Sequence, residues 1–90
     1  MIVVENIKSL LKSPDSKEVS DIILELHEYY DFVFDTNRDN SKGKEAISKA
    51  EACLNKLNEF CEKNNVKPVY RDDKFIKFDL KQYFLNNLKY

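Results

Sequence analysis

Chain-breaking residues are nearly absent from this sequence, which has a single glycine, Gly43, and two prolines, Pro14 and Pro68, in 90 residues. Glycine supplies the positive φ angles of tight turns and phosphate-binding loops, whereas proline interrupts helices. Long uninterrupted stretches therefore favour helices joined by a few polar connections. The same scarcity argues against a glycine-rich nucleotide-binding loop.

The length and composition fit a single helical domain spanning residues 1–90. Hydrophobic residues make up 42% and charged residues 34% of the chain, which is enough apolar material for a packed core. The formal net charge is −1 and the pI is about 5.8, so no global charge excess attracts nucleic acid or a membrane surface. Glu5 and Asn6 interrupt the N-terminal apolar run, and no run reaches the roughly 18 residues of a membrane helix. We therefore expect a cytoplasmic protein without a membrane span.

Apolar residues recur at helical spacing in four stretches of the chain. These stretches cover about residues 2–12, 15–34, 43–63 and 80–89. Each has an apolar stripe with a polar opposite side, which is typical of helices that share one core. The sequence predicts a mainly α fold, a compact antiparallel bundle of three to four helices.

Short polar stretches mark where these helices begin or end. Asp15 and Asp79, followed three residues later by Glu18 and Gln82, fit the spacing of a capping box. We therefore expect the second and last helices to begin at these aspartates. The asparagines of the run 63–65 tolerate the left-handed conformation that closes many helices, so the third helix is expected to end there.

Two connections are less regular. Two structures fit the segment 66–78: an irregular arm, or a short hairpin whose strands flank Asp72 and Asp73. The polar run 35–41 is expected to form a loop. Gly43 follows this loop, and its position predicts a backbone joint between the two long helices.

The stretch predicted as the second helix carries acidic residues without opposing bases. Six of them lie between Lys17 and Arg38, with no lysine or arginine among them. At about 100° per residue these acids fall opposite the apolar stripe, and Leu24 and Phe32 project on their side. Apolar anchors within a charged surface are typical of a protein interface. The predicted partner-binding residues are Glu18, Asp21, Leu24, Glu25, Glu28, Tyr29, Tyr30, Asp31, Phe32 and Asp35.

The favoured functional hypothesis is a non-enzymatic binding module whose acidic helix face occludes a basic surface on another protein. Small acidic bundles of this general sort include bacteriocin and toxin immunity proteins, antitoxins and phage-encoded inhibitors of host defence. The analogy rests on architecture and charge, with no motif matched. A competing interpretation is a merely solvated face, or one covered by another helix or a second copy of the chain.

The C-terminal part has the opposite charge balance. From residue 63 to 90 there are seven bases against three acids, and aromatic residues alternate with the bases. One alternative hypothesis is therefore a small nucleic-acid-associated regulatory factor, although the pI argues against it. Its binding residues would be Lys67, Arg71, Lys74 and Lys77. A further alternative is a self-assembling structural subunit, in which the acidic helix pairs with the basic tail of another copy.

No catalytic arrangement of residues is evident. Cys53 and Cys61 lie eight residues apart within one predicted helix, about 12 Å along its axis, which is too far for a disulfide. We expect two buried, reduced thiols. His27 is the only histidine, and we expect it to be a structural hydrogen-bonding residue at the border of the apolar stripe. The sequence predicts no enzymatic activity and no cofactor.

The loop after the second helix resembles a calcium-binding loop only in part. Its first, third, fifth and seventh places hold Asp35, Asn37, Asp39 and Ser41. The sixth place holds Asn40 where glycine is needed, and the twelfth holds Ala46, which cannot supply the bidentate carboxylate. We therefore expect no metal site there.

Overall fold

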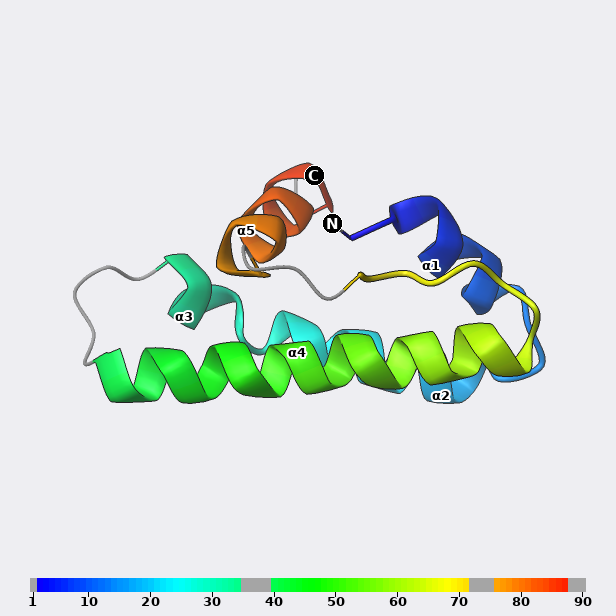
Figure 1. The fold of residues 1–90 in the computed structure, drawn as a ribbon, viewed down its shortest axis with the longest axis horizontal. Helices are drawn as coiled ribbons and strands as arrows, with labels where there is room; N and C mark the ends of the chain where they lie inside the picture. The colour runs from blue at the N-terminus through cyan, green and yellow to red at the C-terminus, as the bar shows by residue number, and fades with distance from the viewer. Residues whose placement is uncertain (1, 35–39, 72–75, 88–90) are drawn as a thin grey trace.

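The protein folds into five helices in the computed structural model, which describes residues 2–34, 40–71 and 76–87. The helices are α1 (Val4–Leu11), α2 (Ser16–His27), α3 (Tyr30–Phe34), α4 (Asn40–Lys63) and α5 (Ile76–Asn87). Figure 1 shows α2 and α4 running in opposite directions, with α1 and α5 above α4. The mainly α fold predicted from the sequence is confirmed.

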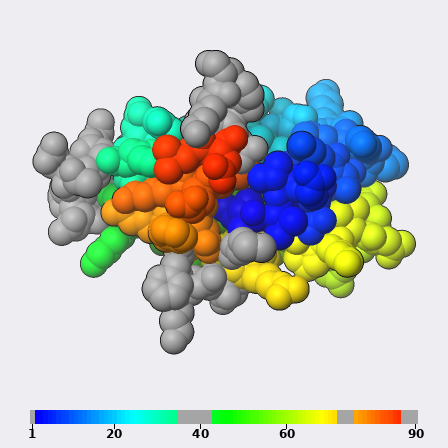
Figure 2. Space-filling view, turned by 90° about the horizontal axis from the view of Figure 1, so that it is seen from above, coloured from blue at the N-terminus to red at the C-terminus, as the bar shows by residue number. Residues whose placement is uncertain are grey.

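Helices α1 and α5 form one layer of the molecule. Seen from above in Figure 2, they lie next to each other, and the yellow segment that follows α4 runs along one edge. Below this layer, α2 and α4 make the most extensive helix–helix contact, and α3 contacts both α4 and α5. The long helix α4 is therefore the platform on which the shorter elements are arranged.

The core between the layers consists of apolar side chains. Among the described residues, none that is polar or charged is buried. The predicted stripes of the second and third helices supply much of this core, as expected from their helical spacing. Its members include Val19, Leu26, Val33, Ala50, Cys53, Leu54, Leu57 and Cys61, together with Leu10, Val69, Tyr70, Leu80 and Phe84.

The helix predicted over 15–34 is interrupted at Glu28 and Tyr29, so this prediction was wrong in part. The backbone N–H groups of these two residues bond to carbonyls three residues back, as in a 3₁₀ turn. The turn separates α2 from α3 and lets the α3 rings contact α5. The rings of Tyr30 and Phe34 are tilted against each other with centroids 4.8 Å apart, and the Tyr30 ring meets that of Phe84 edge to face at 5.3 Å. Tertiary aromatic packing accounts for a bend that no glycine or proline marks.

Helix α4 begins earlier than predicted, at Asn40 instead of about residue 43. Gly43 therefore lies inside the first turns of the helix and has no positive φ angle. The prediction that Gly43 is a joint between two helices was wrong. A Cβ atom at this position would meet nothing within 4 Å.

Replacing Gly43 by alanine should stabilise the protein. Alanine loses less backbone freedom on folding than glycine and is the better helix former, so the free energy of unfolding should rise by about 0.5–1 kcal/mol. Urea unfolding curves of the Gly43→Ala variant and the wild type measure this difference. An unchanged or lower midpoint would contradict a continuous helix at this position.

The C-terminus of α4 closes as the asparagine run indicated. Asn65 has a φ of 57°, and the N–H groups of Asn65 and Val66 bond to the carbonyls of Glu62 and Cys61. This is a Schellman motif, with asparagine in the position that glycine often takes. The prediction of the helix end is confirmed.

Two side chains hold the segment after α4 against the bundle: Asn6, whose Nδ2 donates to the Pro68 carbonyl at 2.9 Å, and Asn58, which makes three bonds. The Asn58 Oδ1 accepts hydrogen bonds from the N–H groups of Val69 and Tyr70, at 2.9 and 3.1 Å, and its Nδ2 donates to the Tyr70 carbonyl at 2.6 Å. An isolated antiparallel bridge also pairs Ile2 with Tyr70. Residues 66–71 form no named strand, so the prediction of an irregular segment is confirmed there. Residues 72–75 lie outside the described residues. Residues 76–78 belong to α5, so for them both the irregular arm and the second strand of the hairpin were wrong.

Both predicted capping boxes were wrong. The Asp15 side chain makes no capping bond to α2 and instead accepts from Asn64 Nδ2 at 2.9 Å and Lys63 Nζ at 3.3 Å. These bonds, that from Asn64 above all, hold the pKa of Asp15 below its usual value. Asp79 lies within the first turn of α5, which starts at Ile76 instead of residue 80. The Asp15 side chain thus joins the start of α2 to the end of α4.

Candidate functional site

The predicted acidic face is exposed but does not form one continuous helix surface. The glutamates and aspartates at positions 18, 21, 25, 28 and 31 are all exposed. The first three lie on α2, Glu28 lies in the turn after it, and Asp31 lies on α3. Asp35 is outside the described residues. We call the exposed set Glu18, Asp21, Glu25, Glu28 and Asp31 the acidic edge.

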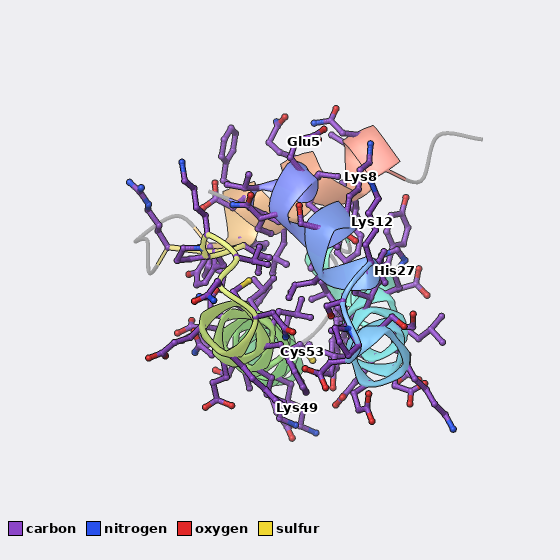
Figure 3. All side chains as sticks on the ribbon, turned by 90° about the vertical axis from the view of Figure 1, so that its right-hand side faces the viewer. Glu5, Lys8, Lys12, His27, Lys49 and Cys53 are labelled. Atoms are coloured by element: carbon purple, nitrogen blue, oxygen red, sulfur yellow. The ribbon has the colours of Figure 1, made fainter. Side chains whose placement is uncertain are left out.

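Two lysines of α4, Lys49 and Lys56, counteract the charge of Glu25 at side chains in the seam between α2 and α4. The pKa of Tyr29 is raised, by burial first and then by the charge of Glu25, while Lys49 lowers it. The pKa of Cys53 is likewise raised by burial and by Glu25, while Lys56 lowers it. Figure 3, which looks along both helices, shows Cys53 between them and Lys49 at the outer side of the seam. The predicted lack of bases between Lys17 and Arg38 holds along the chain, whereas the lysines of α4 act from across the seam.

A pocket opens where the turn after α2 meets the beginning of α4. Its volume is about 240 Å³, and it is lined by Tyr29, Phe32, Glu45, Ala46 and Lys49. Apolar atoms supply most of its surface. Glu45 and Lys49 form an ion pair of 3.2 Å in which both side chains are largely exposed. The pocket is thus an apolar hollow with charged groups at its rim.

The four predicted apolar anchors have different environments. Leu24 has 66% of its surface exposed, the largest value among the large apolar residues described. Tyr29 and Phe32 are half-buried and line the pocket. The Tyr30 ring contacts the rings of Phe34 and Phe84, so part of its surface is already covered. The structure brings Tyr29 and Phe32 together, whereas Leu24 lies apart from them on α2.

The alternative nucleic-acid surface is only partly present. Lys67, Arg71 and Lys77 are exposed, and Lys74 lies outside the described residues. The aromatic residues that would stack on bases are mostly in the core, since Tyr70, Tyr83 and Phe84 are buried. Among the described aromatic residues of the C-terminal part, Phe78 alone is exposed, and one ring makes a poor stacking platform. The geometry gives this hypothesis little support.

His27 is a hydrogen-bonding residue between α2 and α5. Its Nε2 lies 2.9 Å from the Tyr83 hydroxyl, and its ring meets those of Tyr83 and Phe84 edge to face. Burial lowers the pKa of His27 below its usual value, because a charged imidazolium would lose hydration there. The neutral ring is therefore the form that suits the fold.

Stability should fall as the solution is acidified through the usual pKa of histidine, about 6.5. The unfolded chain takes up the proton at higher pH than the folded chain, so unfolding gains protons and becomes easier as pH falls. The loss levels off below the lowered pKa of the folded state. Thermal unfolding between about pH 7.5 and 5.5 measures this loss of stability. The control is His27→Gln, whose side chain does not titrate but can still bond to Tyr83. Equal pH dependence in both proteins would contradict this role.

Cys53 and Cys61 are free and buried, as predicted. Burial raises the pKa of both thiols. Since the thiolate is the nucleophilic form, this environment makes both sulfur atoms less reactive. The two side chains serve the core as small apolar groups.

The calcium-like spacing falls mostly on residues 35–39, which lie outside the described part of the chain. Ser41 and Ala46 belong to α4, and the Ala46 side chain faces the pocket. Across residues 2–34, 40–71 and 76–87, no three His, Cys, Asp or Glu side chains gather closely enough to hold a metal ion.

Comparisons with protein-family models, curated proteins and solved structures found no match to this chain. None of the helices, within the described residues, is long and apolar enough to span a membrane.

Proposed function

We propose that the protein is a non-enzymatic binding module that holds a basic segment of another protein against its acidic edge. The observation that carries this proposal is the apolar pocket, which opens beside exposed carboxylates. An apolar side chain of the partner would enter the pocket, and neighbouring lysine or arginine side chains would meet the acidic residues. This arrangement combines a buried anchor with charges that steer and select the partner.

The pocket has the size of a site for a side chain. At about 240 Å³ it is smaller than the roughly 300–1,000 Å³ typical of small-molecule sites. Phe32 and Tyr29 give it apolar walls, and Ala46 leaves room because its side chain is small. One apolar side chain of a partner segment suits this space better than a cofactor does.

The charges near the pocket favour a cationic partner. The charges of Glu25 and Glu28 raise the pKa of Tyr29 while that of Lys49 lowers it, and Glu45 lies on the pocket rim with Lys49. The Glu45–Lys49 pair is exposed, and exposed pairs contribute only about 0–1 kcal/mol. A basic residue of the partner can therefore replace Lys49 at the Glu45 carboxylate at little cost.

The consequence for the partner would be occlusion. A protein whose basic surface contacts nucleic acid or an acidic substrate would lose that contact when the acidic edge covers it. The module would then act as an inhibitor, in the manner of immunity proteins, antitoxins or anti-defence proteins. The buried, high-pKa thiols and the structurally engaged His27 support binding over catalysis.

A random peptide display library tests this proposal without requiring the natural partner. We expect the wild type to enrich peptides in which an apolar residue lies among lysines and arginines. The Glu25→Lys, Glu28→Lys double variant should bind these peptides at least about 10-fold more weakly. A matched control is Glu59→Lys, Glu62→Lys, which makes the same charge change at exposed α4 positions with the same spacing.

A second variant separates the pocket from the charge. Ala46→Met fills the hollow while leaving every carboxylate in place, and it should weaken peptide binding about as much as the charge reversal does. Circular dichroism would verify that each variant folds. Enrichment of acidic peptides, or equal loss of binding in the Glu59, Glu62 control, would contradict the proposal.

A further inference from the structure

The two most exposed large apolar side chains of the described residues lie on surfaces of opposite charge. Leu24 on α2 is 66% exposed and Phe78 on α5 is 60% exposed. In Figure 1, α5 lies above α4 and α2 lies behind and below it. Neither side chain packs in the hydrophobic core, so both are available to contact another molecule.

The outward side of α5 is apolar and basic. Phe78 and Leu85 are seven residues apart and therefore share one side of the helix, away from the buried Leu80 and Phe84. Leu85 is also exposed, at 47%. Lys77 lies next to Phe78, and Lys81 lies one turn further along. Two large exposed apolar side chains flanked by lysines make this face suited to a contact.

The outward side of α2 is apolar and acidic. Asp21 lies three residues before Leu24 on α2, and Glu28 lies four residues after it, at the C-cap of the helix, so the two carboxylates flank the leucine. Lys17 lies two turns before Leu24 on the same side. The carboxylates outnumber this base around the leucine, and Glu25 adds a further negative charge next to it.

We propose that the Phe78 face of one copy binds the Leu24 face of a second copy, head to tail. Phe78 and Leu85 would cover Leu24, while Lys77 and Lys81 would meet Asp21 and Glu28. In this head-to-tail geometry each bound copy leaves one face free for another copy, so the contact is heterologous. This inference goes beyond the proposed function and does not rest on it, since it needs neither the pocket nor a foreign partner.

Sedimentation velocity over a concentration series tests this contact. We expect wild-type mass to rise above the 10.7 kDa of one chain and the association to weaken as salt increases from about 0.1 M to about 1 M, where the Debye length falls from about 10 Å to about 3 Å. Leu24→Ala and Phe78→Ala should each weaken association at least about 10-fold. Both substitutions replace exposed helical residues, so folding should be preserved.

Mixing the two variants identifies the geometry. An equimolar mixture of Leu24→Ala and Phe78→Ala chains contains one intact pair of faces, so it should form dimers but no longer assemblies. A monomeric wild type at all concentrations in low salt would overturn the proposal. Association lost with Phe78→Ala but unchanged with Leu24→Ala, or a mixture without dimers, would overturn it as well. Peptide binding by the same variants is a separate measurement, so either proposal can fail alone.

Discussion

Replacing Asn58 by alanine is expected to lower the free energy of unfolding by about 2–3 kcal/mol. The side chain makes three hydrogen bonds to the backbone of Val69 and Tyr70, and both residues are buried, at 0% and 2% exposure. Removing the amide leaves buried N–H and carbonyl groups without their partner, which costs more than a hydrogen bond normally contributes. Urea unfolding of the variant measures the loss.

Asn55 provides the matched control for this experiment. It is an exposed asparagine on the same helix, and Asn55→Ala should change stability by less than about 0.5 kcal/mol. An equally small effect of Asn58→Ala would show that the bridge of Ile2 with Tyr70, the bond from Val3 N–H to the Val69 carbonyl and the bond from Asn6 to the Pro68 carbonyl suffice to hold the arm.

Truncation of Phe84 should destabilise the protein more than any of the other substitutions. Its side chain is 1% exposed and contacts the rings of four residues, which come from α2, α3 and α5. These are His27, Tyr30, Phe34 and Tyr83. Phe84→Ala should therefore lower the free energy of unfolding by about 3–5 kcal/mol, through lost burial and the cavity that remains. This is a large share of the roughly 5–15 kcal/mol by which domains are stable.

The neighbouring Leu85 is the natural comparison for Phe84. It lies on the same helix and is 47% exposed, so Leu85→Ala should cost less than about 1 kcal/mol. Thermal and urea unfolding of the two variants would show whether α5 is attached through its Phe84 side. Equal losses in both variants would contradict the packing described for α5.

The sequence predicted the helical fold because its apolar spacing depends only on local periodicity. The buried Val19, Leu26, Leu54 and Leu57 all lie on predicted stripes. The turn at Glu28 and Tyr29 was missed because it has no local signal: its cause is the contact of the α3 rings with Phe84. Long-range packing overrode a pattern that looks continuous along the chain.

Polar residues were harder to interpret from the sequence than apolar ones. Asp15 has the spacing of a helix cap, but Asn64 and Lys63, nearly fifty residues later, bind its carboxylate. Asn58 looks like any polar residue on the predicted third helix, yet it holds the following segment. A side chain with several hydrogen-bonding groups can be satisfied by many partners, and only the tertiary structure decides which one it meets.

Of the candidate site, the exposure of its charged residues was predictable from the sequence. Exposure of the acidic edge and of Leu24 follows from helical position, as the sequence indicated. The pocket could not be predicted from the sequence, because Phe32 and Ala46 belong to different helices that meet only in the folded chain. The single sequence signal was an aromatic residue, Phe32, placed off the apolar stripe of its helix.

An NMR titration would show whether the acidic edge and its pocket bind a basic segment with an apolar anchor. Amide signals of the ¹⁵N-labelled protein would be followed while a library-selected basic peptide is added. We expect the largest shifts in residues 25–32 and 45–49, and their loss in the Ala46→Met variant. Shifts confined to residues 66–71 and the lysines of α5 would contradict binding at the acidic edge.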